Sequence, residues 1–407
     1  MATRLKTPGL ATLTESIIDR RTLSPCSAAS LFPHPIDPAC ELSVIIPARN
    51  EEQSLEQTLS ALATQRARNG LALDPRRYEV LLLINNSSDG SACQAAQVAR
   101  KYPSLRLHIA EIQLPEPDAH VGKARRLLMD AAWHRFRCNG RADGIIASTD
   151  ADTIVSETWV DATIFEIRRG ADAVGGRILI SSEDLQFLDP DARSCHLRDV
   201  GYRALVAEIE SLIDPDPADP WPRHFQHFGA SVAVTASAYL KCGGLPVQES
   251  LEDVALHDAL ERTGASIRHS PNVRVYTSAR VDGRTGFGFA RQLQIWSQAH
   301  RNGHPFLVRS AEDVINELHV RRELRLGWQR SPEQLFASIP EEIPVPCESF
   351  GMYWYRFRRS YLESRRRRDR FPLDEITRAT QNLRVYREHL RRNENAGVHT
   401  RSNISIR

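Results

Sequence analysis

Strands and helices alternate along the first third of the chain, and this order constrains the fold more than any other feature. Three apolar runs rich in leucine and β-branched residues have the pattern and length of strands: 42–47, 78–84 and 105–109. Helical spacing of apolar residues predicts three helices between and after them: from Glu51 or Glu52, at 92–101 and at 121–136. Because parallel strands need a long crossover, this alternation predicts a mostly parallel sheet with helices on both faces.

The following residues predict further strands and helices, separated by one proline-rich segment. Strands are predicted at 144–147, 173–180, 228–234 and 267–275, and helices at 159–169, over most of 181–213 and from about 251 to Gly264. Residues 214–222 hold four prolines, which cannot donate backbone hydrogen bonds, so this segment must be a loop or lid. From about residue 288 the pattern is helical and increasingly rich in arginine, up to the run 365–368.

Composition excludes several classes of protein. Hydrophobic residues make up 41% and charged residues 26% of the 407, as in globular proteins that are not embedded in membranes. The net charge of +2 predicts no nucleic-acid partner and at most peripheral membrane contact. The seven cysteines form no C-x-x-C pair, which favours free thiols in a reducing cytoplasm. The N-terminus lacks the apolar stretch of a secretory signal, and no run approaches the ~18 apolar residues of a membrane span.

Two carboxylates directly follow the buried strand predicted at 144–147. Asp150 and Asp152 are separated by one residue, so on an extended chain both side chains point to the same side. Two neighbouring carboxylates repel each other unless a cation lies between them or one is protonated. The ends of strands are also where open α/β sheets bind ligands. The pair therefore predicts a site for a divalent cation with oxygen ligands, whereas a surface loop without an ion is the simpler alternative.

Six segments, taken in order, resemble the family 2 glycosyltransferases, which have the GT-A fold. They are the opening strand and turn 44–52, the polar turn 85–91, Gly122-Lys123-Ala124, Asp150-Ala151-Asp152, Gly229-Ala230-Ser231 with Gly243-Gly244, and Glu252-Asp253. The resemblance covers roughly residues 42–300. It implies a GT-A domain at 41–300, with a nucleotide-sugar half at 41–155 and an acceptor half at 156–300. An N-terminal extension (1–40) precedes this domain, and a helical, arginine-rich region (301–407) follows it.

The resemblance implies a hexosyltransferase that uses a UDP- or GDP-sugar donor together with Mg²⁺ or Mn²⁺. Asp152 is expected to be the main metal ligand, and Asp150 to contact either the ribose or the ion. Lys123 is expected to bind the diphosphate, although a solvated lysine at a helix start is the simpler interpretation. The other residues expected to bind the nucleotide sugar are Pro47, Ala48, Arg49, Glu51, Asn85 and Asn86.

On the acceptor side, the resemblance implies a general base that deprotonates the attacking hydroxyl in an inverting reaction. Asp253 is the candidate and Glu252 is its neighbour, although carboxylates are also favoured in a first helical turn without any catalytic role. His257 lies four residues later, on the same helix face, and is a candidate third metal ligand. His227 and His269 are lesser candidates for that position.

The sequence departs from the family pattern in two places. Asn85 and Asn86 stand where the family turn carries an aspartate, so the base of the donor, uridine or guanosine, stays open. The Gln-x-x-Arg-Trp motif of processive synthases is absent, which predicts the transfer of a single sugar. The acceptor is expected to be a small molecule or to be lipid-linked, and a homodimer is one candidate assembly.

Two other functions compete with this interpretation. The first is a retaining GT-A transferase with a phosphoglycerate-type acceptor, in which Asp253 would have a structural or acceptor-binding role. The second is a protein that binds anionic surfaces, because residues 353–359 interleave aromatic side chains with arginines. A long helical appendage with a solvated face is the simpler interpretation of that segment.

Overall fold

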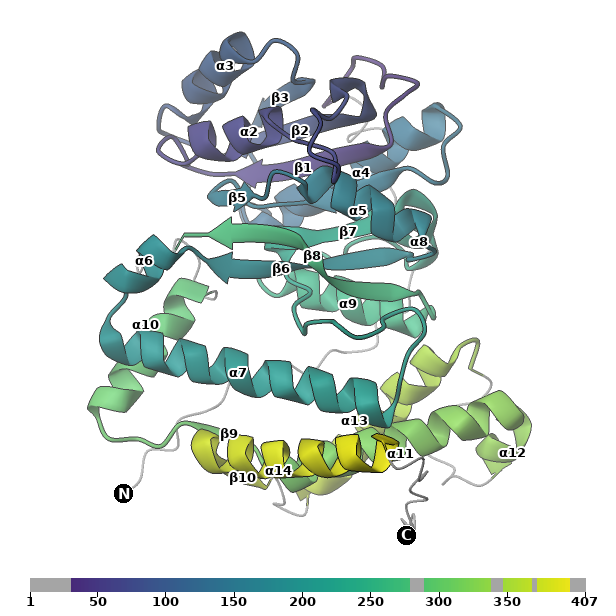
Figure 1. The fold of residues 1–407 in the computed structure, drawn as a ribbon. Helices are drawn as coiled ribbons and strands as arrows, with labels where there is room; N and C mark the ends of the chain where they lie inside the picture. Colours follow the sequence, from purple (N-terminus) through teal and green to yellow (C-terminus); the bar gives the residue numbers. More distant parts are fainter. Residues whose placement is uncertain (1–30, 279–288, 338–346, 368–371, 396–407) are drawn as a thin grey trace.

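The core of the computed structural model is an eight-stranded sheet. The structure describes residues 31–278, 289–337, 347–367 and 372–395. The strand order is β3-β2-β1-β4-β7-β6-β8-β5 (Figure 1). The strands are β1 (Leu42–Ala48), β2 (Tyr78–Asn85), β3 (Leu107–Ile112), β4 (Ile145–Ser148), β5 (Thr153–Val155), β6 (Ala173–Ile180), β7 (Val232–Thr235) and β8 (Ile267–Thr277). The pairs among β3, β2, β1 and β4 are parallel, and so is β6 with β8, whereas β7 and β5 run antiparallel to their partners.

Helices cover both faces of the sheet because its strands are apolar on both sides. In β1, Val44 and Ile46 pack into one core and Ile45 packs into the other, as the alternation of side chains along a strand requires. The first core is closed by α2 (Leu55–Ala63), α3 (Ser91–Lys101) and α5 (Trp159–Arg168). The second is closed by α4 (Val121–Cys138), α8 (Ala236–Lys241) and α9 (Glu252–Arg262).

A third apolar core lies outside the sheet and joins α7 to the C-terminal helices. The long helix α7 runs below the sheet, and α14 lies below α7 (Figure 1). Tyr202, Leu205 and Ile209 of α7 pack against α11 and α14. The elements of this region are α6 (Ser182–Phe187), α7 (Pro190–Ile213), α10 (Phe289–Arg301), β9 (Leu307–Arg309), α11 (Ala311–Arg330), α12 (Pro332–Ala337), α13 (Phe350–Arg367), β10 (Leu373–Glu375) and α14 (Ile376–Asn395).

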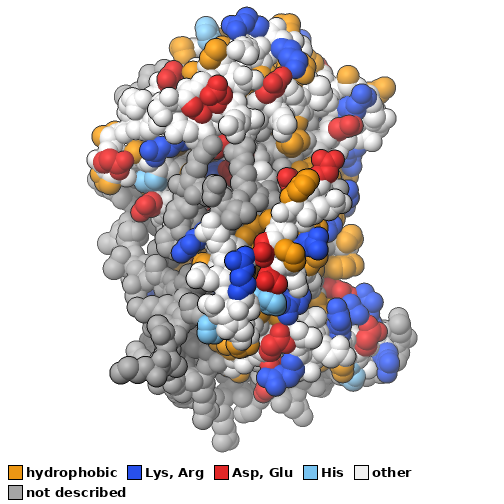
Figure 2. Space-filling view, turned by 90° about the vertical axis from the view of Figure 1, so that its left-hand side faces the viewer, with side chains coloured by type: hydrophobic (Ala, Val, Ile, Leu, Met, Phe, Trp, Pro, Cys, Tyr) orange, Lys and Arg blue, Asp and Glu red, His pale blue; other side chains and the backbone are white. Residues whose placement is uncertain are grey.

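Many C-terminal arginines are paired with carboxylates of α7 and its surroundings. Arg321 pairs with Glu210, and Arg391 pairs with Glu208. On the face shown in Figure 2, Lys and Arg side chains lie interspersed with Asp and Glu. The arginines of the described C-terminal region therefore serve in part to attach it to the rest of the molecule. The side chains of the run 365–368 lie outside the described residues.

The fold class expected from the sequence, a mostly parallel sheet flanked by helices with a helical C-terminal appendage, is confirmed. Local limits differ: α2 begins at Leu55 after a series of turns, and β3 begins two residues later than predicted. The antiparallel direction of β7 and the short strands β5, β9 and β10 were not predicted. No helix in the described ranges has the length and hydropathy needed to cross a membrane. The domain limits at residues 40 and 300 stay predictions.

Candidate active site

Most of the predicted donor and acceptor residues line one cavity of about 1850 Å³. Parallel strands place their carboxyl ends at the same edge of a sheet, which brings the segments after β1, β2 and β4 together. Of the residues selected from the sequence, Pro47, Ala48, Arg49, Glu51, Asn85, Asp150, Asp152, Glu252, Asp253 and His257 line this cavity.

The loops that follow β1 and β2 are locked to each other by hydrogen bonds. The backbone N–H of Asn50 donates to Ser87 Oγ (3.0 Å), and the N–H of Ser88 donates to Asn50 Oδ1 (2.8 Å). Asn50 has a positive φ of 56°, a conformation that asparagine tolerates better than most residues. The N–H of Glu51 donates to Ser91 Oγ (2.8 Å) at the start of α3. These bonds fix the backbone around Glu51, one of the predicted nucleoside contacts.

Asn86 and Lys123 are not among the residues that line the cavity. Asn86 pairs with the backbone of Leu114 through both its amide nitrogen and its amide oxygen (2.9 and 3.0 Å). Lys123 forms an ion pair with Asp118 (3.0 Å), and its side chain is 30% exposed. Asn86 therefore has a structural role in this conformation, and Lys123 would have to leave Asp118 to reach a diphosphate. Both assignments stay predictions.

Arg125 of α4 connects the two carboxylate pairs across the cavity. Its guanidinium donates to Asp150 Oδ1 (2.9 Å) and to Glu252 Oε1 (3.0 Å). It also donates to Ser148 Oγ (2.5 Å) and to the carbonyl oxygen of Gly229 (3.0 Å). Burial alone would lower the pKa of Arg125, but the nearby carboxylates raise it above its usual value. Arg125 is therefore a permanent buried cation that holds β4, α9 and the start of η2 (Gly229–Ser231) at fixed positions.

Arg125 was not selected from the sequence, although the sequence contains a signal for it. Leu128 and Ala132 follow it at i+3 and i+7, so Arg125 lies on the apolar face of α4, where Leu128 and Ala132 are fully buried. A charged residue on the buried stripe of a helix requires partners of opposite charge nearby. Finding those partners required the tertiary structure.

Asp253 is held at the first turn of α9 by two backbone donors. Its Oδ2 accepts the N–H of Gly229 (2.7 Å), and its Oδ1 accepts the N–H of Val254 (2.7 Å). Both oxygens keep a further lone pair, and the residue faces the cavity. The neighbouring Glu252 is buried against Arg125, and burial raises its pKa. The two residues thus have different environments. Asp253 can contact a molecule bound in the cavity, whereas Glu252 forms a structural ion pair with Arg125.

The turn between β4 and β5 fits a divalent cation with oxygen ligands. Thr58 Oγ1 donates to the carbonyl oxygen of Ala151 (2.9 Å), which fixes the residue between the two carboxylates. Asp150 and Asp152 both line the cavity. Arg125 occupies one oxygen of Asp150, and the hydroxyl of Ser278 lies 3.5 Å from Asp152 Oδ2. Carboxylate oxygens are the ligands that Mg²⁺ and Mn²⁺ prefer, so the donor set suits these ions.

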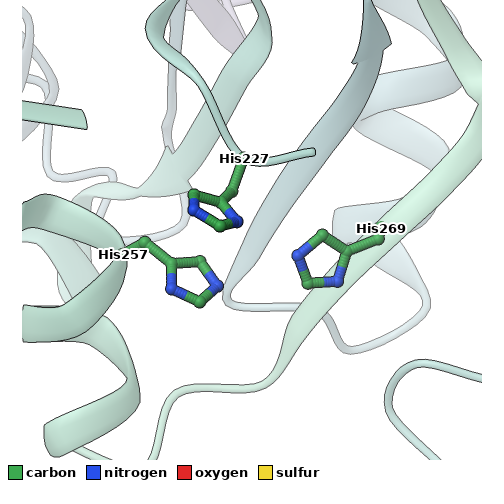
Figure 3. A group of neighbouring side chains, drawn as sticks. All are labelled: His227, His257 and His269. Atoms are coloured by element: carbon green, nitrogen blue, oxygen red, sulfur yellow. The ribbon is translucent and has the colours of Figure 1, made fainter. Parts of the chain in front are cut away.

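His257 lies in a group of three histidines rather than beside these carboxylates. The ligand nitrogens of His227, His257 and His269 lie within 4.8 Å of one another. Figure 3 shows that the rings come from the loop before η2, from α9 and from β8, with one nitrogen of each facing a common space. Among the described residues, no such group of three contains Asp150 or Asp152. Whether His257 completes the aspartate site stays a prediction.

Comparison with known proteins finds similarity to one family of glycosyltransferases. The model of glycosyl transferase family 2 matches residues 43–213. Glycosyltransferase AglE of Haloferax volcanii is 27% identical over 138 residues, which span 34% of this chain and 39% of that protein. The dolichyl-phosphate beta-glucosyltransferase of Drosophila melanogaster is 26% identical over 169 residues, which span 42% and 49%. The chain therefore covers less than half the length of these two relatives.

Two solved structures show weaker similarity. The mannosyltransferase PcManGT from Pyrobaculum calidifontis, in complex with GDP-Man and Mn²⁺, is 14% identical with a TM-score of 0.43, over 90% of this chain and 91% of that one. The glucosyl-3-phosphoglycerate synthase from Mycobacterium tuberculosis, in complex with Mn²⁺ and UDP-glucose, is 17% identical with a TM-score of 0.37, over 67% and 83%. At these TM-scores neither structure defines the ligands of this chain.

Proposed function

We propose that this chain, whose residues 43–213 match the model of glycosyl transferase family 2, moves one sugar from a nucleotide-sugar donor to an acceptor hydroxyl. One observation carries the proposal. The loops after β1 and β2, the aspartate pair and Asp253 line a single cavity, and Arg125 joins the aspartate pair to the acceptor side. A transferase needs its donor and acceptor in one site, because the sugar forms its bond to the acceptor as its bond to the nucleotide breaks.

The donor side is assigned to residues at the ends of β1, β2 and β4. The locked loop around Glu51 and the buried Asn85 contact the nucleoside, and Arg49 lies on the same rim of the cavity. Lys123 binds the diphosphate after its ion pair with Asp118 has opened and phosphate oxygens have taken the place of that carboxylate. Asp152, with Asp150, holds Mg²⁺ or Mn²⁺. When bound, such an ion neutralises the charge that develops on the leaving diphosphate.

Asp253 is assigned as the base that accepts the proton of the acceptor hydroxyl in an inverting reaction. The N–H of Gly229 fixes the orientation of the Asp253 carboxylate. The carboxylate of Glu252 is instead paired with Arg125. A retaining reaction is the second candidate, because both oxygens of Asp253 already accept backbone N–H groups. The anomeric configuration of the product, read by NMR, separates the two. A retained configuration would show that Asp253 is not the general base.

The acceptor is a small molecule or a lipid-linked molecule, and the donor is a UDP- or GDP-sugar. The name of one relative, a dolichyl-phosphate beta-glucosyltransferase, supports a lipid-linked acceptor. A cytoplasmic location is supported by the scattered cysteines, since the six that lie in the described residues are free thiols. Binding to anionic surfaces is the weaker alternative, since many described C-terminal arginines pair with carboxylates.

A thermal-shift screen of nucleotide sugars with and without Mn²⁺ tests the donor and the ion together. A ligand that binds only the folded state raises the melting temperature. One UDP- or GDP-sugar should stabilise the chain only when Mn²⁺ or Mg²⁺ is present. Asp152→Ala should remove this effect without lowering the melting temperature of the free protein. Stabilisation by the same donor without any ion would contradict the proposal.

A further inference from the structure

Three histidines meet on the acceptor side of the cavity, one helical turn from Asp253. His257 lies four residues after Asp253 on α9, and His227 lies two residues before Gly229, whose N–H binds Asp253. The rings of His227 and His257 are stacked, with centroids 4.0 Å apart and an interplanar angle of 24°. His269 approaches from β8, with its ring centroid 5.8 Å from that of His257. The three rings line the cavity and are partly buried.

The ring of His269 is oriented by a buried carboxylate. Its Nδ1 lies 2.8 Å from Asp219 Oδ2, while Asp219 Oδ1 accepts the backbone N–H of His269 (2.8 Å) and a donor from Arg268 (2.9 Å). Asp219 also forms an ion pair with Arg223 (3.0 Å). A carboxylate that accepts a hydrogen bond from the ring requires a proton on Nδ1, which leaves the lone pair of Nε2 facing the other rings. Carboxylates hold metal-binding histidines in this way.

The other two rings lie close to His269 and to each other. The ring centroid of His227 is 6.2 Å from that of His269 and 4.0 Å from that of His257. Within the described part of the chain, His227 makes ring contacts but no hydrogen bond. Neutral imidazoles with free lone pairs are ligands for metal ions rather than for phosphate.

The charges around the rings also permit a cation. Glu210 and Glu261 add negative charge near His257, beside the positive Arg321. Arg321 is itself paired with Glu210, and Arg203, the further cation near His227, is paired with Asp199. Arg223 pairs with both Glu210 and Asp219, and Arg268 pairs with Asp219. The carboxylates around the rings (Asp199, Glu210, Asp219 and Glu261) thus balance the arginines (Arg203, Arg223, Arg268 and Arg321). An additional divalent ion therefore meets no uncompensated positive charge.

We infer that His227, His257 and His269 form a binding site for a transition-metal ion such as Zn²⁺, separate from the oxygen site at Asp150 and Asp152. Three nitrogen ligands select zinc over magnesium, whereas two carboxylates select the reverse. Nitrogens on one tetrahedral zinc lie about 3.4 Å apart, so small ring movements complete the geometry. The ion joins α9, β8 and the loop before Gly229. The metal site itself does not depend on the proposed function.

Zinc affinity of the full chain tests the site. The protein is stripped with a chelator and titrated with Zn²⁺ in competition with a chromophoric chelator. About one ion should bind per chain, and His227→Ala, His257→Ala and His269→Ala should each weaken binding at least tenfold. Asp219→Asn should weaken it roughly 10–100-fold, because Asp219 orients a ligand without touching the ion. Circular dichroism confirms that each variant is folded.

Two controls separate this site from its surroundings. His224 is a buried neighbour of His269, but Ser270 O and the N–H of Gln226 already occupy its two nitrogens. His224→Gln should therefore keep the zinc affinity. Asp152→Asn should also keep it while losing the donor stabilisation that requires Mn²⁺, so failure of one site is distinguishable from failure of the other.

Co²⁺ gives a second measurement that needs no variant. Nitrogen ligation with four or five ligands produces visible absorption far stronger than that of hydrated Co²⁺, and Zn²⁺ should displace it. The proposal is overturned if Co²⁺ gives no such band in the wild-type chain. It is equally overturned if the folded histidine variants bind Zn²⁺ as tightly as the wild type.

Discussion

Arg125 is the residue on which the geometry of the candidate site depends most. Replacing it by methionine should leave Asp150 and Glu252 facing each other without a cation. Loss of one partner from a buried ion pair costs about 3–5 kcal/mol, because the remaining charge stays desolvated. We expect Arg125→Met to lower the free energy of unfolding by about that amount in urea titrations. Donor-dependent stabilisation should be lost as well.

Arg137 provides the matched control for this substitution. It lies in the last turn of the same helix and is exposed. Arg137→Met should change the free energy of unfolding by less than about 0.5 kcal/mol, as is usual for surface positions. Arg125→Lys should fall between the two, since lysine keeps the charge but lacks the fork that reaches both carboxylates. Equal stability of Arg125→Met and Arg137→Met would show that Arg125 does not hold the site together.

Asp253 can be tested without removing its contact with Gly229. The substitution Asp253→Asn keeps a side-chain oxygen that can accept this N–H, but an amide cannot take a proton from the acceptor. We expect Asp253→Asn to lower turnover by roughly 10²–10⁴, the usual contribution of a general base, with donor binding unchanged. Glu249→Gln is the control, since Glu249 is an exposed carboxylate on the same cavity. If turnover stayed normal in Asp253→Asn, Asp253 would have a structural role and would not act as the base.

At the scale of elements, Glu79 of β2 links its strand to β1 and to α4. It accepts hydrogen bonds from Ser43 of β1 (2.7 Å) and Arg135 of α4 (2.6 and 2.9 Å). Arg135 in turn holds the carbonyl oxygens of Phe32 and His34 in the segment before β1. Burial would raise the pKa of Glu79, but His108, Arg135 and Ser43 lower it to about 2. Its carboxylate is therefore more acidic in the folded than in the unfolded chain.

This shift predicts a loss of stability in acid. A lowered pKa contributes stability above the unfolded value of 4.5, and that stability disappears as the pH falls toward about 2. The full shift corresponds to roughly 3 kcal/mol. In urea titrations from pH 6 to pH 3, the stability difference between wild type and Glu79→Gln should shrink as the pH falls. Glu56→Gln, which removes an exposed pair with Lys101, should lower the free energy of unfolding by less than about 1 kcal/mol at pH 6. A Glu79→Gln effect as small as this at pH 6 would contradict the prediction.

The elements also show how far local sequence predicts this fold. The strands β1 and β2 are continuous apolar runs, so their position was predicted to within one residue. The direction of β7 depends on which strands it joins, and local pattern does not encode this choice. The contacts of Arg125 are likewise distant: Asp150 is 25 residues away and Glu252 is 127. Local sequence therefore singled out these carboxylates as candidates, whereas the buried cation between them is visible only in the tertiary structure.

At the scale of the whole molecule, the C-terminal helices are part of the folded core. Truncation near residue 305 would uncover Leu205 and Ile209 of α7, which α11 and α14 bury. A point substitution in α14 is therefore the cleaner test. Leu383 is fully buried in this third core. Leu383→Ala should lower the free energy of unfolding by about 2–5 kcal/mol, as is typical of leucine truncation in a core.

Val385 on the same helix is the control for Leu383, because its side chain is 63% exposed. Val385→Ala should have an effect below about 0.5 kcal/mol in the same denaturation experiment. Since no residue of α14 lines the cavity, donor-dependent stabilisation should persist in both variants. If Leu383→Ala were as stable as Val385→Ala, the third core would not contribute to stability.

The position of Arg125 limits how this chain can be recombined with relatives. The arginine comes from α4 in the predicted nucleotide-sugar half, whereas Glu252 and the carbonyl of Gly229 come from the predicted acceptor half. A chimera that joins this donor half to a foreign acceptor half would bury a guanidinium without its counter-charge. Recombination between relatives should therefore succeed only when both parents carry the arginine and its glutamate, so the two halves are exchanged as a matched pair.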